Sequence, residues 1–368
     1  MSVTINGTNG LTFNDNSTQT TAATGFGFKN RIINPAMVID QRNAGAAVTV
    51  NAANVFYGVD RWFGYGQSAD GVFTIQRITD APSGFTNSMR ATVTTADASI
   101  GASQLYLVQH RIEGFNVADF GFGTAVAVPV TLSFWVKSSV TGTFSGSLGN
   151  TVDLSYAFSY TISSANTWTQ ISVTVPGPTT GTWTTGNGIG LSVTFSLGVG
   201  SSLKGTANTW ANYPYATTGS VDLISTLNAT WQVTGVQLEK GSTATSFDVR
   251  PYGTELQLCQ RYCQIIVGSN TGAGYFASGT NNGTAQARGM ISLKTTMRTA
   301  PSMSFASAAS FLVQAGSSTY TPSAVGQVAT SVDSASMFAT ISGATNGQGC
   351  LIADNTSAAT LVTLTSEL

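Results

Sequence analysis

The sequence predicts an all-β protein whose larger part is a two-sheet sandwich. Between residues 31 and 253, about nine short segments alternate apolar and polar residues, among them Gly71-Val-Phe-Thr-Ile-Gln-Arg-Ile and Val130-Thr-Leu-Ser-Phe-Trp-Val-Lys. A period of two is typical of strands with one buried and one wet face. The chain also holds 54 Thr and 40 Gly, and Thr favours strands. The near-regular strand spacing, without long helical patterns, indicates a sandwich rather than alternating strand–helix units.

Composition excludes several classes of protein. Charged residues make up 8% of the 368 residues, against about a quarter in an average soluble domain. The apolar fraction of 42% is too high for a disordered chain. A net charge of -1 gives no electrostatic footprint for nucleic acid or anionic lipid, so we expect neither as a partner. No apolar run reaches the length of a membrane span, so we expect no membrane insertion.

Four segments follow along the chain. Residues 1–30 form a mostly polar N-terminal arm that needs a partner, or its own copies, to offset its ordering entropy. Residues 31–253 form the sandwich. Residues 254–266 carry a helical pattern and form a short linking helix. Residues 267–368 return to alternating segments with only six charged residues, which predicts a small C-terminal β-domain and much of the contact between subunits.

The linking helix is predicted by apolar residues at helical spacing. Leu258, Cys259, Tyr262, Cys263 and Ile266 fall on one face, with Pro251 and Gly253 just before the segment. The two cysteines, one turn apart, lack further metal ligands, so we interpret them as small buried hydrophobes. Three Cys in all cannot form a disulfide framework.

Several motifs resemble proteins of tailed bacteriophages. Asn14-Asp-Asn-Ser-Thr-Gln-Thr-Thr-Ala-Ala resembles the opening of many tail-fibre and appendage proteins, and Asn30-Arg-Ile-Ile-Asn-Pro-Ala-Met is similar to the start of their carbohydrate-binding-module-like jelly roll. Thr234-Gly-Val-Gln-Leu-Glu-Lys-Gly, continuing to Arg250-Pro-Tyr-Gly-Thr-Glu-Leu, resembles the last strand of that jelly roll and the helix after it. Met297-Arg-Thr-Ala-Pro-Ser-Met-Ser-Phe is similar to their small C-terminal domain. The resemblance implies a jelly-roll fold, a virion protein and a homotrimer.

The strongest candidate for glycan binding is the segment Asn208-Thr-Trp-Ala-Asn-Tyr-Pro-Tyr. Sugar sites need aromatic faces with amides nearby, and here Trp210, Tyr213 and Tyr215 accompany Asn212. Pro214 argues against a long strand, so these residues are expected on a loop, where function concentrates. The alternative is a loop pinned by its own aromatics or packed on a sister subunit.

Other aromatic and titratable residues are expected to be structural. Alternation assigns the cluster Trp62, Phe63 and Tyr65 mostly to the core, and places Trp135 and Trp231 firmly in it. The one histidine, His110, lies in an alternating strand and is interpreted as a strand residue. Arg61 is expected to pair with Asp60 or another nearby acid. The acids form no motif, so no catalytic residue, metal site or cofactor is assigned, although a calcium site built from loop Asp residues stays open.

The sequence therefore predicts a non-enzymatic virion protein made in the host cytoplasm. The leading function is a trimeric tail fibre that contacts glycan on the host cell surface, with residues 1–30 bound to other virion proteins. One alternative is a capsid-decorating or connector fibre without receptor binding. Another is a polysaccharide depolymerase, which would need two carboxylates across a cleft.

Overall fold

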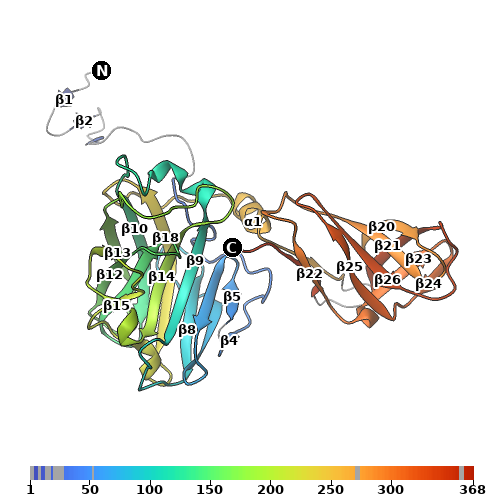
Figure 1. Cartoon of the computed structure of the whole chain (residues 1–368), viewed down its shortest axis with the longest axis horizontal. Helices are drawn as coiled ribbons and strands as arrows, with labels where there is room; N and C mark the ends of the chain where they lie inside the picture. Colours follow the sequence, from blue (N-terminus) through green and yellow to red (C-terminus); the bar gives the residue numbers. More distant parts are fainter. Residues whose placement is uncertain are drawn as a thin grey trace.

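The computed structural model describes residues 4–6, 10–12, 18–19, 29–51, 54–269, 274–355 and 360–368. Figure 1 shows two β-domains side by side, with helix α1 (Tyr252–Gln260) and the C-terminus between them. The predicted all-β class is confirmed. No helix in the described part of the chain is long and apolar enough to cross a membrane. Most of the predicted arm, residues 1–30, lies outside the described residues. Those described there are the short strands β1 (Thr4–Asn6), β2 (Gly10–Thr12) and β3 (Thr18–Gln19) together with residues 29 and 30.

The larger domain is a sandwich of two antiparallel sheets. The six-stranded sheet has the order β13-β10-β18-β8-β7-β4. Its strands are β4 (Val48–Val50), β7 (Val72–Ile78), β8 (Ser88–Thr95), β10 (Val130–Ser138), β13 (Thr169–Val175) and β18 (Thr230–Lys240). The seven-stranded sheet has the order β16-β12-β11-β14-β9-β6-β5. Its strands are β5 (Val55–Val59), β6 (Trp62–Gly66), β9 (Leu105–Glu113), β11 (Gly142–Gly149), β12 (Ser155–Ile162), β14 (Ile189–Val199) and β16 (Thr209–Ala211). This is the predicted jelly-roll sandwich.

Short elements complete the larger domain. The segment after β14 folds back over the outer face of the seven-stranded sheet and contains the parallel pair β15 (Lys204–Gly205) and β17 (Ala216–Thr217). The single-turn 3-10 helices of this domain are η1 (Gly114–Asn116), η2 (Ala118–Phe120), η3 (Ser201–Leu203) and η4 (Leu223–Ser225).

The core between the two sheets follows the period-two pattern of the strands. Leu132, Phe134 and Val136 of β10 point inward, as do Phe195 of β14 and Trp231 of β18. The indole of Trp231 donates to the hydroxyl of Tyr160 at 3.0 Å, so its one polar group is satisfied inside the core. The expectation that Trp135 is also core is wrong. Its neighbours Phe134 and Val136 take the inner face, which leaves Trp135 half-buried on the outer one.

Helix α1 is shorter than predicted. It begins at Tyr252 and ends at Gln260, and residues 263–266, expected in the helix, lie in strand β19 (Cys263–Val267). That strand pairs with β28 (Thr360–Thr365), nearly one hundred residues away, and a partner so distant cannot be seen in a local pattern. Cys259 and Cys263 are both buried, as predicted.

The C-terminal domain has two sheets around its own core. β19 and β28 belong to a three-stranded sheet with β22 (Ser302–Phe305), and a seven-stranded sheet has the order β24-β23-β27-β20-β21-β26-β25. Its strands are β20 (Tyr275–Asn281), β21 (Gln286–Ser292), β23 (Phe311–Ala315), β24 (Ser318–Tyr320), β25 (Ala324–Thr330), β26 (Ser334–Thr340) and β27 (Gly349–Asp354), and the 3-10 helix η5 (Ala308–Ser310) precedes β23.

Candidate functional site

A cleft of about 340 Å³ opens on the outer face of the jelly-roll sheet, between strands β6 and β9 and the segment that follows β14. Its lining combines aromatic rings with hydrogen-bonding side chains. The residues that line it are Phe63, Tyr65, Gln67, Leu105, Leu107, Gln109, Arg111, Thr151, Tyr213 and Tyr215.

The floor of the cleft follows from strand alternation. In β9 the even-numbered residues Tyr106, Val108 and Ile112 enter the sandwich core, so Leu105, Leu107, Gln109 and Arg111 face outward. In β6, Trp62 enters the core while Phe63 and Tyr65 face outward. Phe63 pairs with Gln109 and Tyr65 with Leu107, which places an aromatic ring beside each of these β9 side chains.

The wall of the cleft is the turn around Pro214. Tyr213 has a φ of 53°, an uncommon value for a residue with a side chain. Its neighbours hold the turn: the Ser155 hydroxyl donates to the Pro214 carbonyl at 2.6 Å, and the Tyr215 N–H donates to the Leu203 carbonyl at 2.9 Å. The rings of Tyr213 and Tyr215 then meet edge to face, with centroids 5.0 Å apart. The two tyrosines are therefore fixed before any ligand arrives.

Arg111 lies across the floor in a fixed orientation. Its Nε donates to Oε1 of Gln109 at 3.2 Å, and its Nη1 donates to the main-chain oxygen of Leu368 at 2.7 Å. Its guanidinium lies 4.8 Å from the centre of the Phe63 ring. Gln109 is held in turn, because its Nε2 donates to the Thr194 hydroxyl at 2.7 Å. The C-terminal segment thus helps to orient a side chain of the jelly-roll cleft.

Tyr213 and Tyr215 are protonated throughout the physiological range. Burial is the main cause that raises the pKa of Tyr213 well above its usual value, and the adjacent Tyr215 raises it further. Burial also raises the pKa of Tyr215. Both phenols therefore stay uncharged and can form hydrogen bonds with a neutral or an anionic ligand.

The four residues predicted for glycan binding do not stay together. Tyr213 and Tyr215 line the cleft, and Asn212 between Ala211 and Tyr213 is exposed outside its lining. Trp210 belongs to the short strand β16 and packs on the core side of the sheet edge, with ring centroids 5.4 Å from Tyr156 and 5.7 Å from Trp183. Its indole donates to the Pro176 carbonyl at 2.8 Å. Trp210 thus pins the loop, which is the alternative that the sequence left open.

Eight of the ten residues that line the cleft were not predicted as site residues, among them Phe63, Tyr65, Gln109 and Arg111. Alternation assigned Phe63 and Tyr65 mostly to the core between the sheets. Phe63 is buried, but its ring lies on the outer face of the seven-stranded sheet, at the floor of the cleft. Gln109 and Arg111 alternate with the inward residues Val108 and Ile112, and this outward position of two polar side chains is the signal that could have identified this face.

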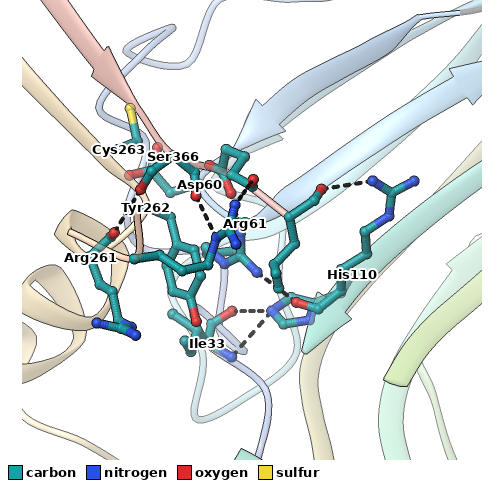
Figure 2. A network of polar contacts seen from close by, with 12 residues as sticks. Ile33, Asp60, Arg61, His110, Arg261, Tyr262, Cys263 and Ser366 are labelled. Atoms are coloured by element: carbon teal, nitrogen blue, oxygen red, sulfur yellow. Dashed lines mark hydrogen bonds and ion pairs between the residues drawn. The ribbon is translucent and has the colours of Figure 1, made fainter. Parts of the chain in front are cut away.

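A second group of polar residues lies buried where the two domains meet (Figure 2). Arg61 forms ion pairs with Glu367, and Arg42 pairs with the same carboxylate at 2.7 Å. The predicted ion pair of Arg61 with a nearby acid therefore goes to Glu367, near the end of the chain, while the Asp60 carboxylate lies 3.9 Å from Arg42. Glu113 accepts from Arg261 and from the Tyr262 hydroxyl at 2.7 Å.

The histidine and the thiols of this junction are buried and uncharged. His110 Nε2 lies 3.1 Å from the Ile33 carbonyl, and burial, reinforced by the charge of Arg61, holds the pKa of the imidazole well below its usual value. Burial also raises the pKa of the Cys263 thiol to about 12. Neutral, buried groups of this kind fit the structural interpretation of His110 and the cysteines. Among the described residues, no three His, Cys, Asp or Glu side chains gather as a metal site.

A smaller cavity of about 210 Å³ lies beside helix α1. The rings of Phe85 and Phe247 meet there edge to face at 4.9 Å, and the ion pair of Arg250 with Glu255 at 3.3 Å lies in its lining. Most of its surface is apolar, so it suits a hydroxyl-rich ligand less well than the cleft does.

The chain matches no protein-family model and no curated protein. Several solved structures are similar to it. One is a putative sugar-binding protein from Bacteroides thetaiotaomicron (14% identity, TM-score 0.34, covering 58% of this chain and 100% of that one). A second is the family 11 carbohydrate-binding module from Clostridium thermocellum (14% identity, TM-score 0.29, covering 55% of this chain and 100% of that one).

A third is the enzymatically active domain of tailspike protein 4 from bacteriophage CBA120 (14% identity, TM-score 0.30). The match covers 58% of this chain and 22% of the tailspike chain. At these scores the likeness adds no argument about the site. A function for this chain has to be argued from the cleft itself.

Proposed function

We propose that this protein is a non-enzymatic carbohydrate-binding subunit of a bacteriophage tail fibre, and that the cleft binds a glycan of the host surface. The observation that carries the proposal is the fixed Tyr213–Tyr215 pair facing a floor of Tyr65, Gln109 and Arg111. Aromatic faces cover the apolar side of a pyranose, and the amide, phenol and guanidinium groups donate to its oxygens. The volume, about 340 Å³, suits one or two sugar rings.

The residues that line the cleft favour binding of a glycan over its cleavage. Hydrolysis of a glycosidic bond ordinarily uses two carboxylic residues on either side of the bond. The described residues that line the cleft hold aromatic, amide, hydroxyl and guanidinium groups instead. Two acids of the jelly-roll side, Glu113 and Asp60, are occupied by contacts at the domain junction.

We also propose that three copies of the chain form a trimer and that this trimer is part of the virion. Weak sugar binding at one cleft gains strength when three copies bind one surface. The outer face of the C-terminal sheet offers a place for subunit contact, because Met290 and Leu351 flank Ser278 there and are 54% and 38% exposed. Residues 1–30 would attach the subunit to other virion proteins.

Two measurements test the proposal. The purified protein is applied to an array of bacterial capsular and O-antigen polysaccharides, and we expect binding that Tyr215→Ala removes. Exposed Asn282→Ala, in the other domain, is the matched control and is expected to bind normally. No binding to any polysaccharide would contradict the glycan-binding function. Light scattering at micromolar concentration is expected to give three chains per particle, and a stable monomer would contradict the trimer.

A further inference from the structure

The charge of the cleft is carried by one side chain. Among the described residues that line it, Arg111 is the only one with a formal charge, and the others donate through phenol hydroxyls of Tyr65, Tyr213 and Tyr215 or through the amides of Gln67 and Gln109. The hydroxyl and amide groups of the lining can accept hydrogen bonds as well as donate them, so Arg111 is the one described lining residue that can only donate. A positively charged group that only donates suits a ligand that brings an anionic acceptor.

Arg111 is oriented but retains donors for a ligand. Gln109 and Leu368 occupy its Nε and Nη1, and Nη2 makes no hydrogen bond to any described residue. The side chain is half-buried and stacked against Phe63, so part of its hydration has been removed. A guanidinium held in this way loses little further side-chain entropy when it binds an anion.

The neighbouring acids are already occupied. Glu113 lies two residues further along β9, but it accepts from Arg261 and from the Tyr262 hydroxyl. Glu367 lies next to Leu368, but its carboxylate pairs with Arg61 and Arg42. No acidic side chain of the described chain forms an ion pair with Arg111 within 4.0 Å. Arg111 therefore has Leu368 and Gln109 as its hydrogen-bond partners and no acidic side chain among the described residues, which leaves Nη2 open to an acidic ligand.

We infer that the cleft selects an acidic glycan, and that Arg111 binds the carboxylate of a uronic or sialic acid residue while Tyr213 and Tyr215 pack on the sugar ring. The inference rests on the proposed glycan-binding function and specifies its ligand class. A carboxylate carries one negative charge, which matches the single charge of Arg111, and its two oxygens accept the free Nη donors. A phosphate group would bring more charge than the cleft can balance.

The test compares matched oligosaccharides by isothermal titration. Oligogalacturonate and oligosialic acid are each measured beside the same oligomer after chemical reduction of its carboxyl groups. We expect at least one acidic oligomer to bind about tenfold more tightly than its reduced form, because a charged hydrogen bond is lost. The affinity of the acidic form is expected to fall as salt rises, as ion pairing requires.

Two variants separate the role of Arg111 from a change in folding. Arg111→Gln is expected to remove the preference for the acidic form, so that the acidic and reduced oligomers bind with similar affinity, and Arg111→Lys is expected to restore part of the preference. Arg288→Gln removes the same charge from the exposed face of the C-terminal sheet and is the control. Equal binding of acidic and reduced oligomers to the native protein would overturn the inference and leave glycan binding intact. Binding of neither would contradict the glycan-binding function as well.

Discussion

The guanidinium of Arg61 lies 3.6 Å from the centre of the Tyr262 ring, and this stack joins the two domains. Arg61 occupies the turn between β5 and β6 with a φ of 71°, and Tyr262 directly precedes the first strand of the C-terminal domain. The same guanidinium pairs with Glu367 and donates to the Arg111 carbonyl at 2.6 Å. The junction is therefore continuous with the strand that forms the floor of the cleft.

Loss of the Glu367 carboxylate is expected to destabilise the protein. Glu367→Gln leaves Arg61, whose side chain is only 2% exposed, without its anionic partner. Removal of one partner of a buried pair costs about 3 kcal/mol. The free energy of unfolding in urea measures this loss. Asp119→Asn, which breaks an exposed pair with Arg31, is the control and is expected to cost less than about 1 kcal/mol. Equal losses would contradict the account of the junction.

His110 is expected to make stability depend on pH. Burial and the charges of Arg61 and Arg250 lower the pKa of the folded-state imidazole, while the Ile33 carbonyl opposes them only in part. The unfolded chain therefore binds a proton near pH 6.5 and the folded one does not. The stability due to neutral His110 is complete above that pH and declines as pH falls, by up to about 1.4 kcal/mol per pH unit.

The measurement for His110 is the unfolding free energy from pH 7.5 to 5. The unfolding free energy is determined at each pH for the native protein and for His110→Gln. Contributions of the carboxyl groups then cancel when the value of one protein is subtracted from that of the other. We expect the difference between the two proteins to shrink as pH falls, because only the native protein loses stability through this imidazole. Parallel curves over this range would show that His110 does not titrate as argued.

Loss of the Trp210 ring is expected to lower stability, whereas loss of the Tyr215 ring is expected to weaken glycan binding. Trp210→Ala removes a half-buried ring from the contact with Tyr156 and Trp183, at a cost of about 2 kcal/mol. Tyr215→Ala removes a wall of the cleft and is expected to weaken glycan binding at least tenfold with a smaller effect on unfolding. Urea denaturation and titration with a bound polysaccharide measure the two effects. A Trp210→Ala protein with native stability and no binding would reverse these assignments.

The two strand tryptophans are expected to differ as well. Trp231 is fully buried and its indole donates to the Tyr160 hydroxyl, so Trp231→Ala is expected to cost about 4 kcal/mol. Trp135 is half-buried on the outer face, so Trp135→Ala is expected to cost about 1 kcal/mol. Denaturant midpoints decide the order, and a larger loss at Trp135 would contradict the strand parity described here.

Local pattern was enough to predict most strands of the jelly roll. Alternation identified β7, β8, β9, β10 and β18, because each buries one face against the opposite sheet. It failed where two large apolar residues are adjacent, as at Phe134 and Trp135, since only Leu132 and Val136 reveal which parity is inward. The end of helix α1 was missed because the partner of Cys263–Val267 lies at Thr360–Thr365.

The residues of one side of the candidate site could be predicted from the sequence, because they are close together in the chain. The residues of the other side could not, because distant segments bring them there. The turn around Pro214 drew attention to Tyr213 and Tyr215, which do line the cleft. The opposite side comes from β6 (Trp62–Gly66) and β9 (Leu105–Glu113), far earlier in the chain, and its position depends on non-local pairing such as that of Tyr65 with Leu107. Arg111 also depends on Leu368, at the other end of the described chain. No local pattern contains such contacts.

The most direct test of the central claim is the dissociation constant of one surface polysaccharide for the native protein and for the double variant Tyr213→Ala, Tyr215→Ala. The polysaccharide is one that the native protein binds on the array, and circular dichroism confirms that the variant is folded. The account predicts that the double variant loses at least tenfold in affinity. Unchanged affinity in a folded double variant would show that the cleft is not the glycan-binding site.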